Sequence, residues 1–185
     1  ALHTNMEFIG EHTLIGSLGQ AFISIAFAAS LLAAFSFYKS SLNEKLKSIW
    51  LPLARAAFYT HSLAVIGIIS CMFIMIYNHY FEYQYVWQHS SLELPTHYMI
   101  SCFWEGQEGS FLLWTFWNII LGSILIKKAN SWEPTVMTIV SVIQVFLVSM
   151  VLGIYVFGVK LGSNPFILIR NLEEIHKYIW VNRIQ

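Results

Sequence analysis

The stretch TLIGSLGQAFISIAFAASLLAAFSFY, residues 13–38, decides the fold class, because it carries no charged side chain from end to end. A helix needs about 20 apolar residues to cross a hydrocarbon core of roughly 30 Å. The whole chain of 185 residues is 57% hydrophobic and 11% charged. Such a composition leaves too little polar surface for a water-soluble domain. The sequence therefore predicts a membrane protein.

Three more apolar runs are long enough to span the bilayer. They cover residues 51–77, 110–127 and 135–159. Each is expected to be a helix, because a lipid-exposed backbone must satisfy its own hydrogen bonds. Pro52 and Pro134 lie near the expected starts of two of them, where a missing N–H costs nothing. The prediction is an all-α integral membrane protein in which residues 1–185 form a single bundle of four transmembrane helices.

Positive charges set the expected orientation. The first connection carries Lys39, Lys45 and Lys47, and the third carries Lys127 and Lys128. The long connection 78–109 contains no lysine or arginine. By the positive-inside rule the two short connections, 39–50 and 127–134, are cytoplasmic. The N-terminus, the outer loop 78–109 and the outer tail 160–185 are then periplasmic, in the inner membrane of a bacterium.

The tail and the remaining composition add further expectations. FILIRNLEEIHKYIWVNRIQ, residues 166–185, places Leu168, Leu172 and Ile175 on one helical face, which predicts an amphipathic helix at the membrane surface. A formal net charge of zero shows no nucleic-acid footprint. Cys71 and Cys102 lack a metal-binding spacing, so no metal site is expected; a disulfide between them stays open.

The outer loop ends in an unusual stretch, FWEGQEGSFLLW, residues 103–114. Gly106 and Gly109 would let the chain turn sharply into the membrane. Ser110 is a plausible N-cap, so the third span should begin within a residue or two of it. Glu108 would be stabilised by the partial positive charge at the helix start. The aromatic residues of 85–104 should pack against the bundle.

A longer pattern around this stretch resembles a known family. Residues 85–114 read Y-V-x-x-H-S-S-x-x-L-P-x-x-Y-x-x-S-x-x-W-x-G-Q-E-G-S-x-L-L-W, which is similar to an outer loop of the CcmF-type cytochrome c maturation proteins. The later turn SNPF, residues 163–166, fits the same family. The family's tryptophan-rich haem motif, WGxxWxWD, is not found in this sequence. The chain therefore resembles the N-terminal portion of a haem lyase.

The resemblance implies a function in cytochrome c biogenesis. Members of this family attach haem covalently to apocytochrome c on the outer face of the membrane. Carried over to this chain, Trp104, Gln107 and Glu108 would shape the outer site, and His89 is a further candidate for it. Haem would be held mainly by parts of the protein not present here, so this portion by itself is not expected to be catalytic. The implied partners are the remainder of the haem lyase, a haem chaperone, apocytochrome c and membrane lipid.

Two other functions stay open at this point. The chain could be a b-type haem membrane anchor of a respiratory complex, or a structural subunit that binds no haem. The anchor requires pairs of histidines facing each other across the membrane, but His61 is the one histidine inside an expected span. For Trp104 an interfacial aromatic belt is a common alternative to haem contact. For Glu108 the alternative is simple helix-terminus electrostatics.

Polar residues in the middle of the spans suggest a buried layer. His61, Asn118 and Gln144 each lie nine or ten residues from the inner end of their expected span. At ~1.5 Å per residue this places them near the bilayer centre, where isolated polar groups are costly. We predict that all three face inward and that at least two lie within hydrogen-bond reach, directly or through a water. His61 is also a candidate for binding an intramembrane haem or quinone.

Overall fold

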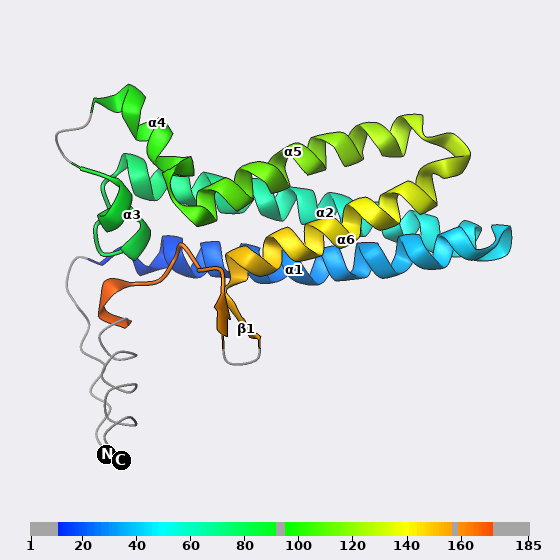
Figure 1. Cartoon of the computed structure of the whole chain (residues 1–185), viewed down its shortest axis with the longest axis horizontal. Coiled ribbons are helices and arrows are strands. Elements are labelled where there is room, and N and C mark those ends of the chain that lie inside the picture. Colours follow the sequence, from blue (N-terminus) through cyan, green and yellow to red (C-terminus); the bar gives the residue numbers. More distant parts are fainter. Residues whose placement is uncertain (1–10, 92–94, 157–158, 172–185) are drawn as a thin grey trace, which may run out of the picture.

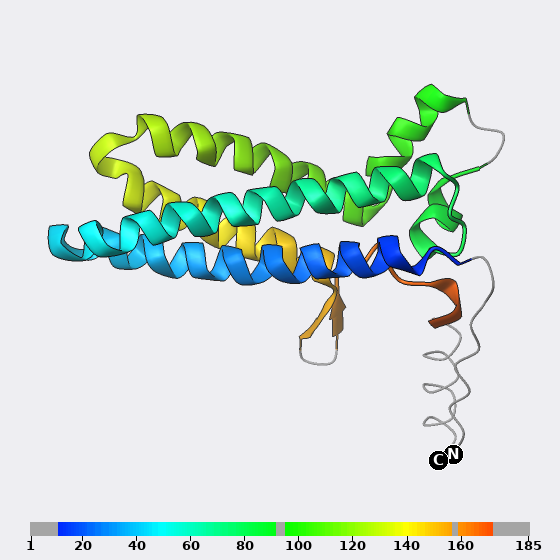
Figure 2. The ribbon, with the colours of Figure 1, turned by 180° about the vertical axis from the view of Figure 1, so that it is seen from behind.

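Four long helices dominate the computed structural model, which describes residues 11–91, 95–156 and 159–171. They are α1 (Thr13–Leu42), α2 (Glu44–Tyr77), α5 (Gln107–Lys128) and α6 (Glu133–Leu152). All are long and apolar enough to cross a membrane. They lie side by side as an elongated bundle, with the α1–α2 and α5–α6 connections at the same end (Figures 1 and 2). The predicted four-span, all-α membrane fold is confirmed.

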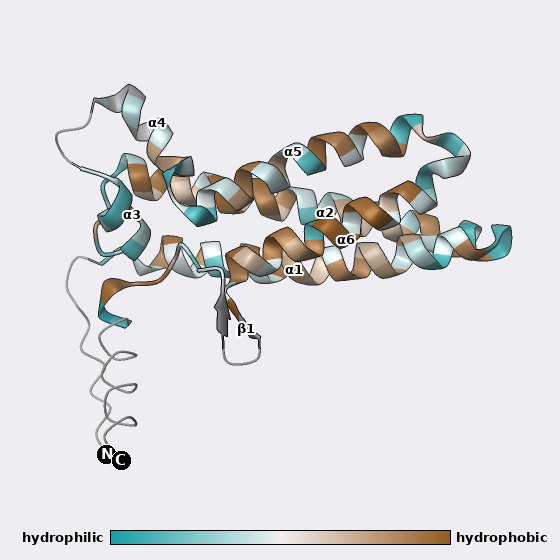
Figure 3. Ribbon diagram, in the orientation of Figure 1, coloured by the Kyte–Doolittle hydropathy of each residue, from teal (hydrophilic) through white to brown (hydrophobic). Residues whose placement is uncertain are grey.

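Two short helices, α3 (Gln84–His89) and α4 (Thr96–Glu105), lie at the opposite end of the bundle (Figure 1). The 3₁₀ turn η1 (Asn130–Trp132) joins α5 to α6 at the end that holds the α1–α2 connection. Two short strands, β1 (Ile154–Val156) and β2 (Val159–Leu161), pair antiparallel with Tyr155 opposite Lys160. Hydrophobic residues line the long helices and polar residues collect near their ends (Figure 3).

The first connection is much tighter than the sequence predicts. Residues 39–50 are largely helical, and Asn43 is the break between α1 and α2. The Asn43 side chain accepts a hydrogen bond from the backbone N–H of Leu46 at 2.9 Å, which caps α2. The second helix therefore begins at Glu44 rather than near residue 51, and Pro52 lies inside it. The cap explains the difference, because it satisfies a helix donor that would otherwise be unpaired.

The last span is shorter than predicted. It ends at Leu152 rather than 159, because Gly153 adopts a left-handed conformation with φ of 72° and closes the helix. The backbone N–H of Gly153 bonds to the carbonyl of Ser149 at 3.2 Å, a C-terminal arrangement that favours glycine. The strands β1 and β2 follow immediately. Most of the predicted amphipathic tail helix, from residue 172 onward, lies outside the described residues.

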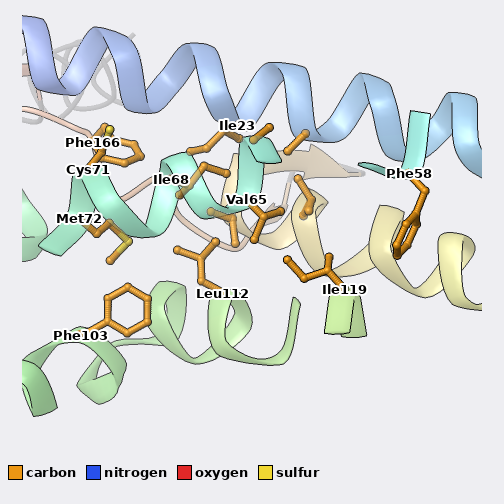
Figure 4. Packing of buried hydrophobic residues seen from close by; sticks show 14 of the residues in the cluster. Ile23, Phe58, Val65, Ile68, Cys71, Met72, Phe103, Leu112, Ile119 and Phe166 are labelled. Atoms are coloured by element: carbon orange, nitrogen blue, oxygen red, sulfur yellow. The ribbon is translucent and has the colours of Figure 1, made fainter. Parts of the chain in front are cut away.

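The core runs along the bundle between the helices. α1 packs against both α2 and α6, and α5 packs mainly against α6. Figure 4 shows Ile23 of α1, Val65 and Ile68 of α2, and Leu112 and Ile119 of α5 among the buried side chains. Small residues line the closest approaches: a Cβ on Gly122 would lie 3.0 Å or less from the Phe58 ring. Close packing of this kind holds membrane helices together where no hydrophobic force does.

An ion pair joins α2 and α6 near their lysine-rich end. Arg55 Nε lies 2.7 Å from Glu133 Oε1, and Arg55 Nη2 lies 2.5 Å from Glu133 Oε2. Glu133 is 3% exposed, whereas Arg55 is 44% exposed at its side chain. This two-pronged geometry suits a guanidinium and a carboxylate. The pair fixes the start of α6 against α2.

Candidate outer-face site

Tyr85 organises the end of the bundle where α3, α4 and α5 meet. Its hydroxyl donates to the backbone carbonyl of Phe103 at 2.6 Å and lies 3.2 Å from that of Cys102. Both carbonyls belong to the last turn of α4, where a helix leaves its acceptors unpaired. Tyr85 is 2% exposed, so these bonds form away from water. One phenol therefore holds α4 in place and caps it.

The two glycines of the stretch 103–114, Gly106 and Gly109, have different functions. Gly106 separates α4 from α5 with φ of −83° and ψ of 163°, so the helix breaks there as predicted. Gly109 lies inside α5 and does not form part of a turn. A Cβ on Gly109 would overlap the carbonyl oxygen of Phe103 and approach the Tyr85 hydroxyl to 2.7 Å. Gly109 is thus required for close approach of two helices, which corrects its predicted role as a turn residue.

The start of α5 also differs from the prediction. The helix begins at Gln107, three residues before Ser110, and its N-cap is Gly106. Ser110 donates its hydroxyl to the carbonyl of Trp104 at 3.0 Å, so it bonds to α4 instead of capping α5. Glu108 lies in the first turn of α5, where its carboxylate is favourably placed in the field of the helix terminus.

The candidate residues Trp104, Gln107 and Glu108 lie at the α4–α5 junction and differ in exposure. Trp104 is 44% exposed and stands at the end of α4, beside Phe103, with which its ring makes an edge contact at 6.4 Å. Phe103 is buried and stacks on Phe73 of α2 at 4.7 Å. Gln107 is exposed and Glu108 is half-buried on the following turn. The α4–α5 junction therefore presents an indole, an amide and a carboxylate from a rigid base.

The predicted packing of the aromatic residues of 85–104 holds only in part, because Trp87, Tyr98 and Trp104 are 64%, 55% and 44% exposed. Tyr85, Val86, Cys102 and Phe103 are all buried, and residues 92–94 lie outside the described chain. Cys71 and Cys102 are both free thiols, which decides against the disulfide. Burial raises the pKa of the Cys102 thiol, and the nearby Glu105 carboxylate raises it further. Desolvation likewise raises the pKa of Tyr85 well above the ordinary value, so this phenol remains a proton donor to its carbonyls.

His89 packs beneath the junction instead of pointing away from it. Its Nδ1 lies 3.0 Å from the carbonyl of Tyr85, one turn earlier in α3. The two rings lie 4.6 Å apart at a tilt of 30°. A Cβ on Gly106 would lie 3.0 Å from the His89 ring. His89 thus fills the space under the helix break, and its ring completes the packing around Tyr85.

The SNPF turn anchors the same end of the bundle from the other side. The Asn164 side chain accepts a bond from the backbone N–H of Phe166 at 2.9 Å, which forms a tight turn. Phe166 is 1% exposed and presses against α1 at Gly19, where a Cβ would overlap its ring. The next residues pair with the start of the outer loop, because Gln84 N–H bonds to the carbonyl of Ile167 at 3.0 Å.

Tyr83 completes this anchorage. It is 1% exposed, donates its hydroxyl to the carbonyl of His12 at 2.8 Å, and accepts from the N–H of Gly16 at 3.0 Å. The first turn of α1 is therefore capped by a tyrosine from the outer loop. Sequence reasoning missed both Tyr83 and Phe166 as structural anchors. Phe166 belongs to the quoted SNPF turn, whereas Tyr83 lies two residues before the quoted pattern begins.

The predicted intramembrane layer forms only in part. His61 and Gln144 are 0% exposed, as predicted, but each bonds elsewhere. His61 Nδ1 lies 2.9 Å from the carbonyl of Ala26, and Gln144 donates Nε2 to the carbonyl of Thr115 at 3.2 Å. Asn118 is half-exposed and donates to the carbonyl of Trp114 within its own helix at 3.0 Å. Asn118 is only partly buried, so the predicted inward orientation is met less fully by Asn118 than by His61 and Gln144.

The described residues do not fit a complete haem site. His61 is fully covered, and its ring lies 6.2 Å from that of Phe58 inside the packed bundle, which leaves no face open to a porphyrin. Its Nε2 is buried without a hydrogen-bond partner, so one ligating atom is present, without the broad apolar slot that haem needs. Within residues 11–91, 95–156 and 159–171, no three His, Cys, Asp or Glu side chains are grouped to hold a metal ion.

Known proteins similar to this chain belong to cytochrome c biogenesis. No protein-family model matches the chain. The chain is 27% identical over 157 residues to the cytochrome c-type biogenesis protein CcmF of Haemophilus influenzae, which covers 83% of this chain and 23% of that protein. Among solved structures, it is similar in fold to a cytochrome c haem lyase CcmF, with a TM-score of 0.68 and 24% identity. That match covers 78% of this chain and 24% of the solved one.

The matches cover only a small part of each similar protein. The chain spans about a quarter of the length of the proteins it matches. Both matches cover most of this chain. In sequence and in fold, this chain therefore resembles one part of the CcmF-type cytochrome c biogenesis proteins.

Proposed function

We propose that this chain is the N-terminal transmembrane part of a cytochrome c haem lyase, and that it supports covalent attachment of haem to apocytochrome c. The observation that carries the proposal is the match to a CcmF protein over 83% of this chain. The α4–α5 junction supplies a local reason, because it holds Trp104, Gln107 and Glu108 on a rigid base at one end of the bundle. By the distribution of lysines that end is periplasmic, in a bacterial inner membrane.

The role of the junction is contact rather than haem ligation. Trp104 offers a broad apolar plane with one donor, Gln107 offers a donor and an acceptor, and Glu108 offers negative charge. These groups suit recognition of a protein surface or of a haem edge held by another part of the lyase. The chain itself supplies no complete ligand set among its described residues, so haem is held mainly by the remainder of the lyase. The haem chaperone and apocytochrome c are the other partners.

Packing argues against the alternative of a b-type haem anchor. Such an anchor needs histidines facing each other across a slot, whereas His61 is covered on every side and bonds to Ala26. A haem-free structural subunit remains the competing function, because every described contact of the junction also stabilises the fold. A haem lyase part and a structural subunit predict different effects of surface substitutions at the junction on cytochrome c yield.

Complementation tests this difference. Cells lacking the native gene would carry the complete lyase with Trp104→Ala, Gln107→Ala or Glu108→Gln, and cytochrome c would be measured by haem-stained gels. Trp132→Ala is the matched control, since Trp132 is 71% exposed at the opposite end of the bundle. We expect at least one junction variant to lower cytochrome c yield severalfold at normal lyase levels. Full yield in all three would favour a purely structural part.

A further inference from the structure

The outward face of α5 differs from the other exposed faces of the bundle. Trp114 and Trp117 are 64% and 60% exposed, and Leu121 and Ile124 follow on the same stripe at 48% and 52%. Asn118 lies between them, half-buried, and its amide donates to the carbonyl of Trp114 at 3.0 Å. We call residues 114, 117, 118, 121 and 124 the α5 stripe. The exposed large hydrophobics of α6 are Ile139, Val142, Ile143 and Phe146, which suit lipid.

The depth of the α5 stripe in the membrane makes contact between its polar groups and lipid unfavourable. Asn118 lies ten residues from Lys128, the end of α5, so it is about 15 Å from that end and near the bilayer centre. Indoles prefer the interface, where their N–H finds water or headgroups. Trp117 is next to Asn118 in the chain, and so lies at the same depth. An amide and an indole N–H therefore share one exposed face at mid-membrane, where polar groups normally find protein partners.

The burial of the four long helices also indicates that α5 has an uncovered face. Within its most apolar window α5 is 33% buried, whereas α2 is 50% buried and α1 and α6 are 39% buried. It packs against α6 and more weakly against α2 and α4. The proteins that this chain resembles are about four times longer than the matched region. Further helices of such a protein must pack on some face of this bundle, and the α5 stripe combines an amide and two indoles on the least buried of the four long helices.

We propose that the α5 stripe is a docking face for a transmembrane helix from the remainder of the haem lyase. The docking helix presents a hydrogen-bonding side chain to Asn118 and an apolar surface to Trp114 and Trp117. This inference rests on the proposed function, because it names the lyase as the source of the helix. It goes further by assigning the contact to one face and to one polar pair in the membrane.

Site-specific photocrosslinking tests the proposal in membranes containing the complete lyase. The photoreactive residue p-benzoylphenylalanine would replace Trp117, and in a matched control Phe146 of α6. The two positions are equally exposed, at 60% and 58%, and both are aromatic. Mass spectrometry of the crosslinked peptides would identify the partner segment. We expect position 117 to crosslink to a lyase helix outside this chain and position 146 to give mainly lipid adducts. Lipid adducts at both positions would overturn the proposal.

Asn118→Leu gives a second readout that does not depend on the probe's reactivity. Interhelical hydrogen bonds in membranes average about 0.6 kcal/mol, so removing this one should lower the crosslink yield at position 117 about threefold. An unchanged yield would mean that Asn118 does not contact the docking helix, which would refute the polar pair. Cytochrome c yield, measured in parallel, distinguishes failure of the docking face from failure of the proposed function. Normal maturation without the crosslink would refute the docking face and leave the proposed function standing.

Discussion

Gly109→Ala should open the α4–α5 junction, and its effect follows from the structure. The added methyl would overlap the Phe103 carbonyl oxygen and lie 2.7 Å from the Phe103 carbonyl carbon. Overpacking a well-packed site costs about 1–3 kcal/mol where side chains adjust, and here the obstacle is backbone. The Phe103 carbonyl also accepts the Tyr85 hydroxyl, a bond worth about 1 kcal/mol. Alanine recovers at most ~1 kcal/mol of helix propensity. The net destabilisation should be about 2–3 kcal/mol.

Labelling of Cys102 reports this opening directly. Cys102 is 3% exposed in the last turns of α4, so its thiol reacts only when the junction opens. Since about 1.4 kcal/mol is tenfold, the open population should rise roughly 30- to 150-fold. With fast reclosing, the maleimide labelling rate follows that population. The assay would use Cys71→Ala as background, so that Cys102 is the one thiol in the chain.

Gly122→Ala is the matched control on the same helix. Its new methyl would meet the Phe58 side chain deep in the bundle, far along α5 from the junction. Its effect on Cys102 labelling should be less than about twofold, because distant sites rarely couple. If Gly109→Ala also labels within twofold of the parent, the junction is not closed by this contact and the reasoning is refuted.

Three other outcomes are expected. Arg55→Met leaves the buried Glu133 carboxylate unpaired and should destabilise the bundle by about 3 kcal/mol, measured as a loss of thermal stability in detergent; an unchanged melting temperature would contradict the pairing. Asn130→Cys should resist impermeant maleimide on whole cells and react after lysis, whereas periplasmic labelling would reverse the proposed topology. His61→Leu should leave the reduced-minus-oxidised haem spectrum of the complete lyase unchanged, and loss of a haem band would show ligation by His61.

The sequence by itself determined the spans and one feature of the outer loop. Continuous apolar length identified the four membrane-crossing helices, because a bilayer core demands a minimum helix length. The helix break at Gly106 was also predictable, since two glycines lie close together before a long apolar run. Helix ends were less so: Asn43 capped α2 seven residues earlier than expected, and Gly153 ended α6 seven residues earlier. Caps act locally and override the hydropathy signal.

Tertiary structure decided which way each residue faces. In water an amphipathic stripe tells the inside of a helix from the outside. In a membrane, lipid is as apolar as the core, so this contrast fades. Depth could therefore be counted for His61, Asn118 and Gln144, but the weaker burial of Asn118 could not be predicted. The roles of Tyr85 and Gly109 likewise depend on carbonyls of α4 brought against them by folding, a contact that no spacing in the chain specifies.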